Sequence, residues 1–251
     1  MKTIKKTIVL AFLCCLTVNV SQAFQKFYRV HQDNVLPSKL MEYEKIAKEF
    51  NEACVKHNFP GAWLCATMDD MRYLYVSPVE KFADLDDRPF AEMAKAMGKD
   101  FGDMFDRFDQ CYNSHYDYII VMNEELSYMP DGISQTQEGQ DYRDYYFIHY
   151  LPKDHAKIKE GMKAVKEMFA SKGSKSYYRI YHTGFGTTDN YYMVAMSSKD
   201  AIESATKEEE NKKVLGPDRW ETFMKVMNYA TKVEEVTGEI RRDLSYSPKT
   251  Q

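Results

Sequence analysis

The sequence predicts an α+β protein in which two copies of a β-α-β-β-α-β unit follow one another in a single chain. Three observations lead to this fold class. The motif Leu126–Pro130 (LSYMP) returns 118 positions later as Leu244–Pro248 (LSYSP). Apolar residues repeat with strand and helix periods in the same order in both halves. Each half also opens with a strand pattern followed by a proline suited to the first turn of a helix, Pro37 and Pro152.

The first copy is predicted to extend over residues 24–130. Segments rich in β-branched and aromatic residues indicate strands, and apolar stripes with a period of 3.6 residues indicate helices. The expected strands are 27–31, 62–67, 72–77 and 115–122, and the expected helices are 37–58 and 90–108.

The second copy is predicted to extend over residues 142–251, after a linker at 131–141 that contains two glycines and several polar side chains. A highly charged stretch, Lys207–Lys213, indicates a solvated face or a loop. The expected strands are 142–149, 176–182 and 191–196, and the expected helices lie over 158–169 and 220–227.

Helices can cover only one face of such a sheet, so the other face must be buried against a partner. A second copy in the same chain supplies one. We therefore expect two tandem ferredoxin-like βαββαβ repeats packed sheet-to-sheet as a fused α/β barrel with an enclosed centre. At an offset of 118 the strand Phe27–His31 aligns with Tyr145–His149, although the two opening prolines lie only 115 apart.

The element order, the duplication and the strand–proline–helix opening resemble the dimeric α/β-barrel superfamily, which includes the NIPSNAP, EthD and antibiotic-biosynthesis-monooxygenase-like families. The resemblance covers nearly the whole chain after residue 23. It implies a scaffold shared by cofactor-independent monooxygenases, haem-binding and haem-degrading proteins. No family motif matches residue by residue, so no catalytic residue is carried over.

The first 23 residues have the pattern of a secretory signal peptide. Three lysines precede the apolar run Thr7–Val20, and the small residues Ser21 and Ala23 favour cleavage before Phe24. We therefore expect an exported protein, either periplasmic or extracellular. No later segment has 18 uninterrupted apolar residues, so no membrane anchor is expected after cleavage.

Charge and cysteine content exclude some classes of function. Without the three lysines of the signal, 31 basic residues face 38 acidic ones, a net charge of −7. No basic footprint for nucleic acid is visible. No CxxC spacing is present and no metal site is predicted. An odd number of cysteines remains after cleavage, which we expect to be buried thiols: Cys54, Cys65 and Cys111.

Side-chain parity selects candidate ligand-binding residues, because residues two apart on a strand share a face. Val30 and Ile148 suit packing beneath helices. The opposite face would then look into the barrel and carry Arg29, His31, Arg143, Tyr145 and His149.

Two further candidates lie on the predicted second strand of each half. His182 takes the place of Thr67, and Trp63 aligns with Tyr178. An arginine fork recognises carboxylates and histidine exchanges protons near neutral pH, so this set predicts a pocket for an anionic or oxygen-rich ligand. The alternative is that these side chains lie near strand ends and pair with local acids, with Trp63 filling the core.

The resulting hypothesis is an exported small-molecule-binding protein with its ligand between the two sheets. The alternatives are a monooxygenase- or isomerase-like enzyme on the same scaffold, and an interaction module with tyrosine-rich outer faces. Haem or metal ligation by His31, His149 or His182 is not favoured, because no carboxylate follows at a defined spacing. A homodimer is compatible with these patterns.

Overall fold

The computed structural model describes residues 26–134 and 136–248, so the expected signal and its cleavage site lie outside the described residues. The strands are β1 (Lys26–Val35), β2 (Leu64–Met68), β3 (Arg72–Val79), β4 (Tyr112–Met122), β5 (Tyr142–Tyr150), β6 (Tyr178–Thr183), β7 (Tyr191–Ser198) and β8 (Ala230–Ile240). The α-helices are α1 (Leu40–Lys56), α2 (Ala91–Met97), α3 (Lys99–Phe108), α4 (His155–Ser171), α5 (Ala201–Leu215) and α6 (Arg219–Met227).

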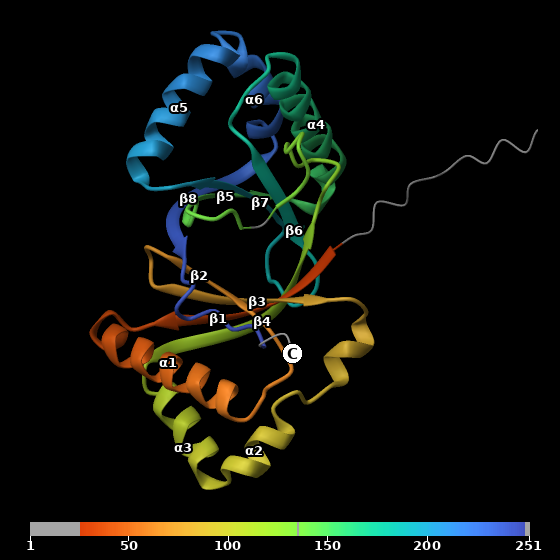
Figure 1. Cartoon of the computed structure of the whole chain (residues 1–251). Coiled ribbons are helices and arrows are strands. Elements are labelled where there is room, and N and C mark those ends of the chain that lie inside the picture. The colour runs from red at the N-terminus through yellow and green to blue at the C-terminus, as the bar shows by residue number, and fades with distance from the viewer. Residues whose placement is uncertain (1–25, 135, 249–251) are drawn as a thin grey trace, which may run out of the picture.

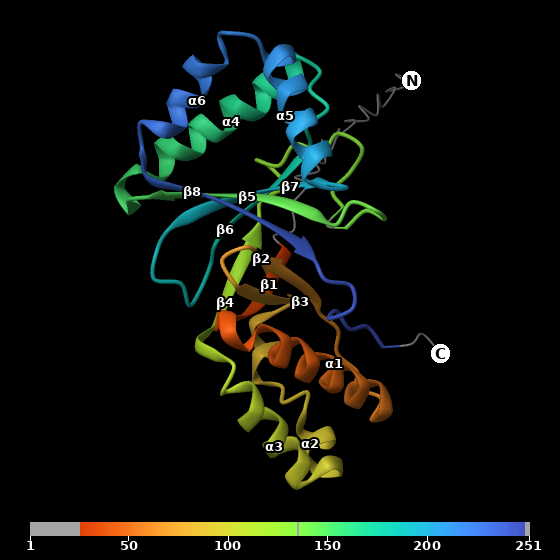
Figure 2. The same cartoon turned by 90° about the vertical axis from the view of Figure 1, so that its left-hand side faces the viewer.

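The strands close into one antiparallel barrel in the order β1-β3-β2-β8-β5-β7-β6-β4. The helices lie outside it, with α1, α2 and α3 on one side and α4, α5 and α6 on the other (Figures 1 and 2). The predicted α+β barrel is therefore confirmed. None of the helices in the described ranges is long and apolar enough to cross a membrane.

One predicted helix needs correction and one helix was not predicted. The stripe at 90–108 forms two helices, because Gly98 between α2 and α3 has a φ of 60°, a left-handed conformation that ends the first helix. The charged stretch Lys207–Lys213 is the solvated face that was expected as an alternative to a loop, and it belongs to helix α5, which was not predicted. Short 3-10 turns begin at Pro37 and Pro152, just before α1 and α4.

The register of the opening strands differs from the predicted alignment. A β-bulge interrupts β1 between Asn34 and Val35 and β5 between His149 and Tyr150, 115 positions apart. The two prolines are also 115 positions apart, so the opening strand and the proline after it share one offset between the two halves. The expected offset of 118 is wrong by three residues in these strands, and an odd error exchanges the two faces of a strand.

The exchanged faces decide which side chains fill the barrel. Tyr28 and Val30 of β1 lie in the buried cluster inside it. Arg29 and His31 therefore lie outside, contrary to the prediction. The β5 residues were assigned to the correct face, because Tyr145 lies in the same interior cluster.

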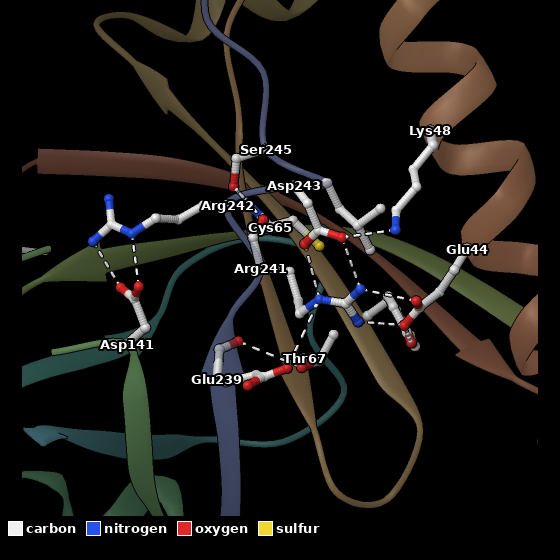
Figure 3. Close-up of polar contacts among 12 residues, drawn as sticks. Glu44, Lys48, Cys65, Thr67, Asp141, Glu239, Arg241, Arg242, Asp243 and Ser245 are labelled. Carbon is white, nitrogen blue, oxygen red and sulfur yellow. Dashed lines mark hydrogen bonds and ion pairs between the residues drawn. The ribbon is translucent and has the colours of Figure 1, made fainter. Parts of the chain in front are cut away.

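The repeated LSY motif joins the two halves at both seams of the barrel. After β8, Ser245 Oγ accepts the Cys65 backbone N–H at 2.9 Å and donates to the Arg241 carbonyl at 2.8 Å. Tyr246 then forms a β-bridge with Trp63. These contacts hold the C-terminal segment against the first half of the chain (Figure 3).

The other seam repeats these contacts after β4. Ser127 Oγ accepts the Ile180 N–H at 2.9 Å and donates to the Asn123 carbonyl at 2.7 Å. Tyr128 forms a β-bridge with Tyr178. Each LSY motif thus ties the end of its own half to the second strand of the other half.

An ion-pair network reinforces the C-terminal seam. Arg241 donates to both carboxylate oxygens of Glu44, at 2.8 Å for Nη2–Oε2, and to Asp243, which also pairs with Lys48 at 3.0 Å (Figure 3). The hydrogen bonds from Arg241 lower the pKa of Glu44. The side chains of Arg241 and Glu44 are 17% and 18% exposed, so solvent screens this pair only partly.

Candidate functional site

The barrel encloses a cavity of about 420 Å³. This volume lies in the range of small-molecule sites, about 300–1,000 Å³. Its walls are mostly aliphatic and aromatic, and charged groups lie in two places. The apolar lining includes Val30, Leu64, Met68, Leu74, Ile120, Phe147 and Met193.

Arg143 lines this cavity from β5, although it is only 1% exposed. Its Nη1 donates to the backbone carbonyls of Gln140 and, at 2.9 Å, of Tyr142. Burial, followed by the nearby charge of Arg179, lowers the pKa of Arg143 to about 10. Two guanidinium groups thus lie close together in the barrel, and the charge of Arg179 disfavours that of Arg143.

Arg179 reaches the cavity from β6 and is 4% exposed. It donates to the Ser134 carbonyl at 2.6 Å and to Ser197 Oγ at 2.8 Å. Its Nε is buried and has no hydrogen-bond acceptor among the residues described. A buried charged donor without an acceptor is costly, so an anion beside it would be stabilised.

Two tyrosines border the arginines. Tyr145 and Tyr181 both belong to the interior cluster, and burial raises the pKa of Tyr145 to about 12. The phenol therefore stays neutral near pH 7 and can donate or accept a hydrogen bond. We call Arg143, Arg179, Tyr145 and Tyr181 the arginine–tyrosine cluster.

A second polar region of the cavity contains His149. Its Nδ1 lies 3.9 Å from Asp189 Oδ2, and its ring lies 5.5 Å from that of Tyr191. Arg72 pairs with Glu234 at 3.0 Å and lies 5.0 Å from the ring centre of Phe147. This region can hold polar parts of a ligand and includes a proton-exchanging group.

Three of the predicted site residues, Arg143, Tyr145 and His149, therefore come together in the barrel. Arg29 does not, because it pairs with Asp117 on the outer face at 2.8 Å. His31 lies beside Asp33 and the same Asp117. Burial lowers the pKa of His31, but the carboxylates of Asp117 and Asp33 outweigh it and raise the pKa to about 9.

The other two predicted residues also lie outside the barrel. Trp63 packs among Phe50, Phe59 and Tyr246 beneath the first helices and donates from Nε1 to a backbone carbonyl, as expected for a core residue. His182 lies on the outer face of β6, 6.1 Å from the ring of Tyr192. Burial lowers the pKa of His182, which favours a neutral imidazole.

Sequence reasoning missed Arg179. On β6, Tyr178 and Ile180 belong to the core under the helices, so Arg179 and Tyr181 must face the barrel. The signal that could have found it is the alternation of residues 178–182 along the predicted strand.

A second cavity of about 410 Å³ lies between helices α4, α5 and α6 and the outer face of β5 and β7. Its lining combines apolar residues, such as Ile148, Phe169 and Val194, with polar and charged ones, and Arg179 borders this cavity as well as the barrel cavity. Tyr178 is among its lining residues, and the buried hydroxyl of Tyr178 has no hydrogen-bond partner in the described parts of the chain. This cavity was not predicted.

Neither a protein-family model nor a curated protein matches the sequence. Solved structures do resemble it. An anthrone oxidase-like protein has a TM-score of 0.60 at 11% identity, with 90% of this chain and 94% of that chain covered. A protein described as a monooxygenase, from Lactobacillus acidophilus NCFM, has a TM-score of 0.51 at 9% identity, with coverages of 89% and 97%. A chlorite dismutase variant from Candidatus Nitrospira defluvii has a TM-score of 0.51 at 11% identity, with coverages of 87% and 92%.

The chain shares the fold of these structures, a closed antiparallel barrel with its helices outside. The likeness to the dimeric α/β-barrel superfamily is supported for the fold alone, and membership in that superfamily stays a prediction. Membership in the NIPSNAP or EthD families stays a prediction. Sequence identities near 10% indicate a shared fold but not a shared activity, because this scaffold hosts many chemistries.

Proposed function

We propose that this protein binds a small organic anion inside the barrel, with its acidic group at the arginine–tyrosine cluster and its apolar body along the aliphatic wall. The observation that carries the proposal is the pair of buried guanidinium groups, Arg143 and Arg179, in one cavity. Water would solvate them poorly there, whereas a carboxylate could accept from both. The volume of about 420 Å³ suits a ligand of roughly two fused rings.

A matched pair of probes tests this proposal. We expect 2-naphthoate to bind by calorimetry and to raise the melting temperature, and its neutral isostere 2-naphthamide to bind more weakly. Removing one partner of a buried charge pair costs about 2–5 kcal/mol. Arg143→Gln should therefore weaken naphthoate binding by at least about thirtyfold and leave the amide almost unaffected.

Tyr178→Phe is the control variant, because Tyr178 lines the second cavity and is not among the residues that line the barrel cavity. It should bind naphthoate like the parent protein. Equal affinity of the parent for acid and amide would refute the proposal without any variant. Loss of binding in Tyr178→Phe with retention in Arg143→Gln would refute it too, by moving the ligand to the second cavity.

We also propose export and a tandem duplication. Export is supported by the basic start, apolar run and small residues of the first 23 positions. Fractionation should recover the protein outside the cytoplasm with Phe24 at its N-terminus, and protein found only in the cytoplasm with an intact Met1 would contradict export. The duplication is supported by the common element order and by the equivalent contacts of Ser127 and Ser245. The boundaries 24–130 and 142–251 and a homodimer stay predictions.

A monooxygenase-like activity is the second candidate, supported by His149, a proton-exchanging side chain that reaches the cavity. The name of the anthrone oxidase-like neighbour suggests anthrone as a probe. Oxidation by O₂ would convert anthrone to anthraquinone and water, with uptake of one O₂ per anthrone. His149→Gln should slow this turnover if the imidazole takes the proton from carbon. An unchanged rate would exclude that role.

A further inference from the structure

We propose that His31, Asp33 and His115 bind a divalent transition-metal ion such as Zn²⁺ on the outer face of β1 and β4. One ligand atom from each of these side chains lies within 4.8 Å of the other two. This site is separate from the barrel cavity, whose lining includes none of the three residues. The proposal therefore does not depend on the proposed function.

The strand register builds the cluster. His31 lies opposite Asp117, and Asp33 lies opposite His115, on neighbouring antiparallel strands. All four side chains share one face because alternate residues do. Two imidazoles and two carboxylates therefore form a square, although more than 80 positions separate the two residues of each pair in sequence.

Two of the three proposed ligands, Asp33 and His31, are already held in place by a second side chain. The buried carboxylate of Asp33, 4% exposed, accepts the Tyr43 hydroxyl at Oδ2, 2.5 Å away. Its other oxygen, Oδ1, lies 3.2 Å from His31 Nε2 but has no hydrogen bond among the described residues. One oxygen is thus held by the protein, and the other is directed at the place where the metal would lie.

The same arrangement orients the imidazole. His31 Nδ1 lies 3.4 Å from Asp117 Oδ1, and Arg29 holds that carboxylate through Nε at 3.0 Å and Nη2 at 2.8 Å. Metal-bound histidines usually donate their second ring N–H to a carboxylate, which sets the tautomer and the ring direction. Asp117 provides that partner, so His31 Nε2 is the nitrogen offered to the metal.

The distances suit a zinc-type ion. Ligand atoms about 2.0–2.1 Å from a tetrahedral metal lie about 3.3 Å from one another. The Asp33–His31 pair already has this spacing at 3.2 Å. His115 is exposed, so its ring can turn inward without disturbing the core. Two nitrogens and one oxygen favour Zn²⁺ and its neighbours over Mg²⁺ or Ca²⁺ and leave a fourth position for water.

Metal titration of the untagged, EDTA-stripped protein tests the site. We expect one Zn²⁺ per chain by calorimetry, and one Co²⁺ with the visible absorption of a four-coordinate centre. His115→Gln should weaken both by more than tenfold, since even an outer partner contributes about 10–100-fold. Asp117→Asn should weaken binding by about tenfold through its effect on His31.

His57→Gln, at the end of α1, is the matched control and should bind like the parent protein. If Asp33→Asn or His31→Gln fails to fold, the exposed His115 still decides the question. If the parent protein bound no stoichiometric Zn²⁺ or Co²⁺, the proposal would be overturned. A protonated His31 would then be the group that links the carboxylates of Asp33 and Asp117. Equal affinity of His115→Gln and the parent would also overturn it.

Discussion

Gly238 should tolerate no side chain, because β8 passes too close to β2 at this point. A Cβ added there would lie 1.9 Å from the Thr67 backbone oxygen, whereas ordinary contacts begin at 3.4 Å. Gly238→Ala must therefore separate the two strands by about 1.5 Å. Backbone bonds of 2.9 Å on either side, from Asp69 to Thr237 and from Arg241 to Cys65, cannot both survive that separation.

The expected cost follows from these contacts. Two backbone hydrogen bonds contribute about 1 kcal/mol each, and forced overpacking adds about 1–3 kcal/mol. Gly238→Ala should therefore lower the free energy of unfolding by about 3–5 kcal/mol, a large part of the 5–15 kcal/mol of a typical domain. Equilibrium unfolding in urea, followed by circular dichroism, measures this difference.

The same substitution elsewhere is the control. Gly102 lies inside α3 with nothing within 4 Å of an added Cβ, so Gly102→Ala should stabilise the protein by about 0.5–1 kcal/mol. Gly161→Ala in α4 gains the same helical preference, but its added Cβ would lie 2.5 Å from the Lys225 backbone oxygen. The stability of this variant should therefore lie between those of the other two. A Gly238→Ala protein as stable as its parent would refute the close approach of β2 and β8.

Three other predictions concern the seams and the thiols. Ser127→Ala and Ser245→Ala each remove the acceptor of a backbone N–H, so each should lower the free energy of unfolding by about 1–3 kcal/mol; stable variants in urea would contradict this. The lowered pKa of Glu44 means that its contribution is present above its unfolded pKa and is lost as pH falls through its folded pKa. Glu44→Gln should therefore be less stable at pH 7 and lose less stability than the parent from about pH 5 to 2, and parallel curves would exclude this contribution. Burial raises the pKa of all three described thiols, that of Cys54 to about 12, so Cys54, Cys65 and Cys111 should react with a disulfide reagent only on unfolding; rapid native reaction would contradict that.

Local patterns were sufficient for most of the elements and their order. Apolar periodicity located the other strands and helices but missed α5 and β8, which have few buried residues and carry no clear apolar stripe. Pro37 and Pro152 marked the starts of the first helices of the two halves, and the LSY motif marked equivalent points after β4 and β8. These signals are local because the period of a strand or helix is a property of consecutive residues. The same patterns predicted a barrel with helices outside, since a sheet covered on one face must bury the other.

Those local patterns could not predict the register of the strands or which distant strands pair with each other. A strand with apolar residues on both faces, as in β1, does not reveal which face is inside, so a three-residue alignment error sent Arg29 and His31 to the wrong side. Arg179 became a cavity residue, and Asp33 a neighbour of His115, only when β6 and β4 took their places in the closed sheet. Contacts of this kind join residues far apart in the chain, and their geometry depends on barrel closure, which no short stretch of sequence encodes.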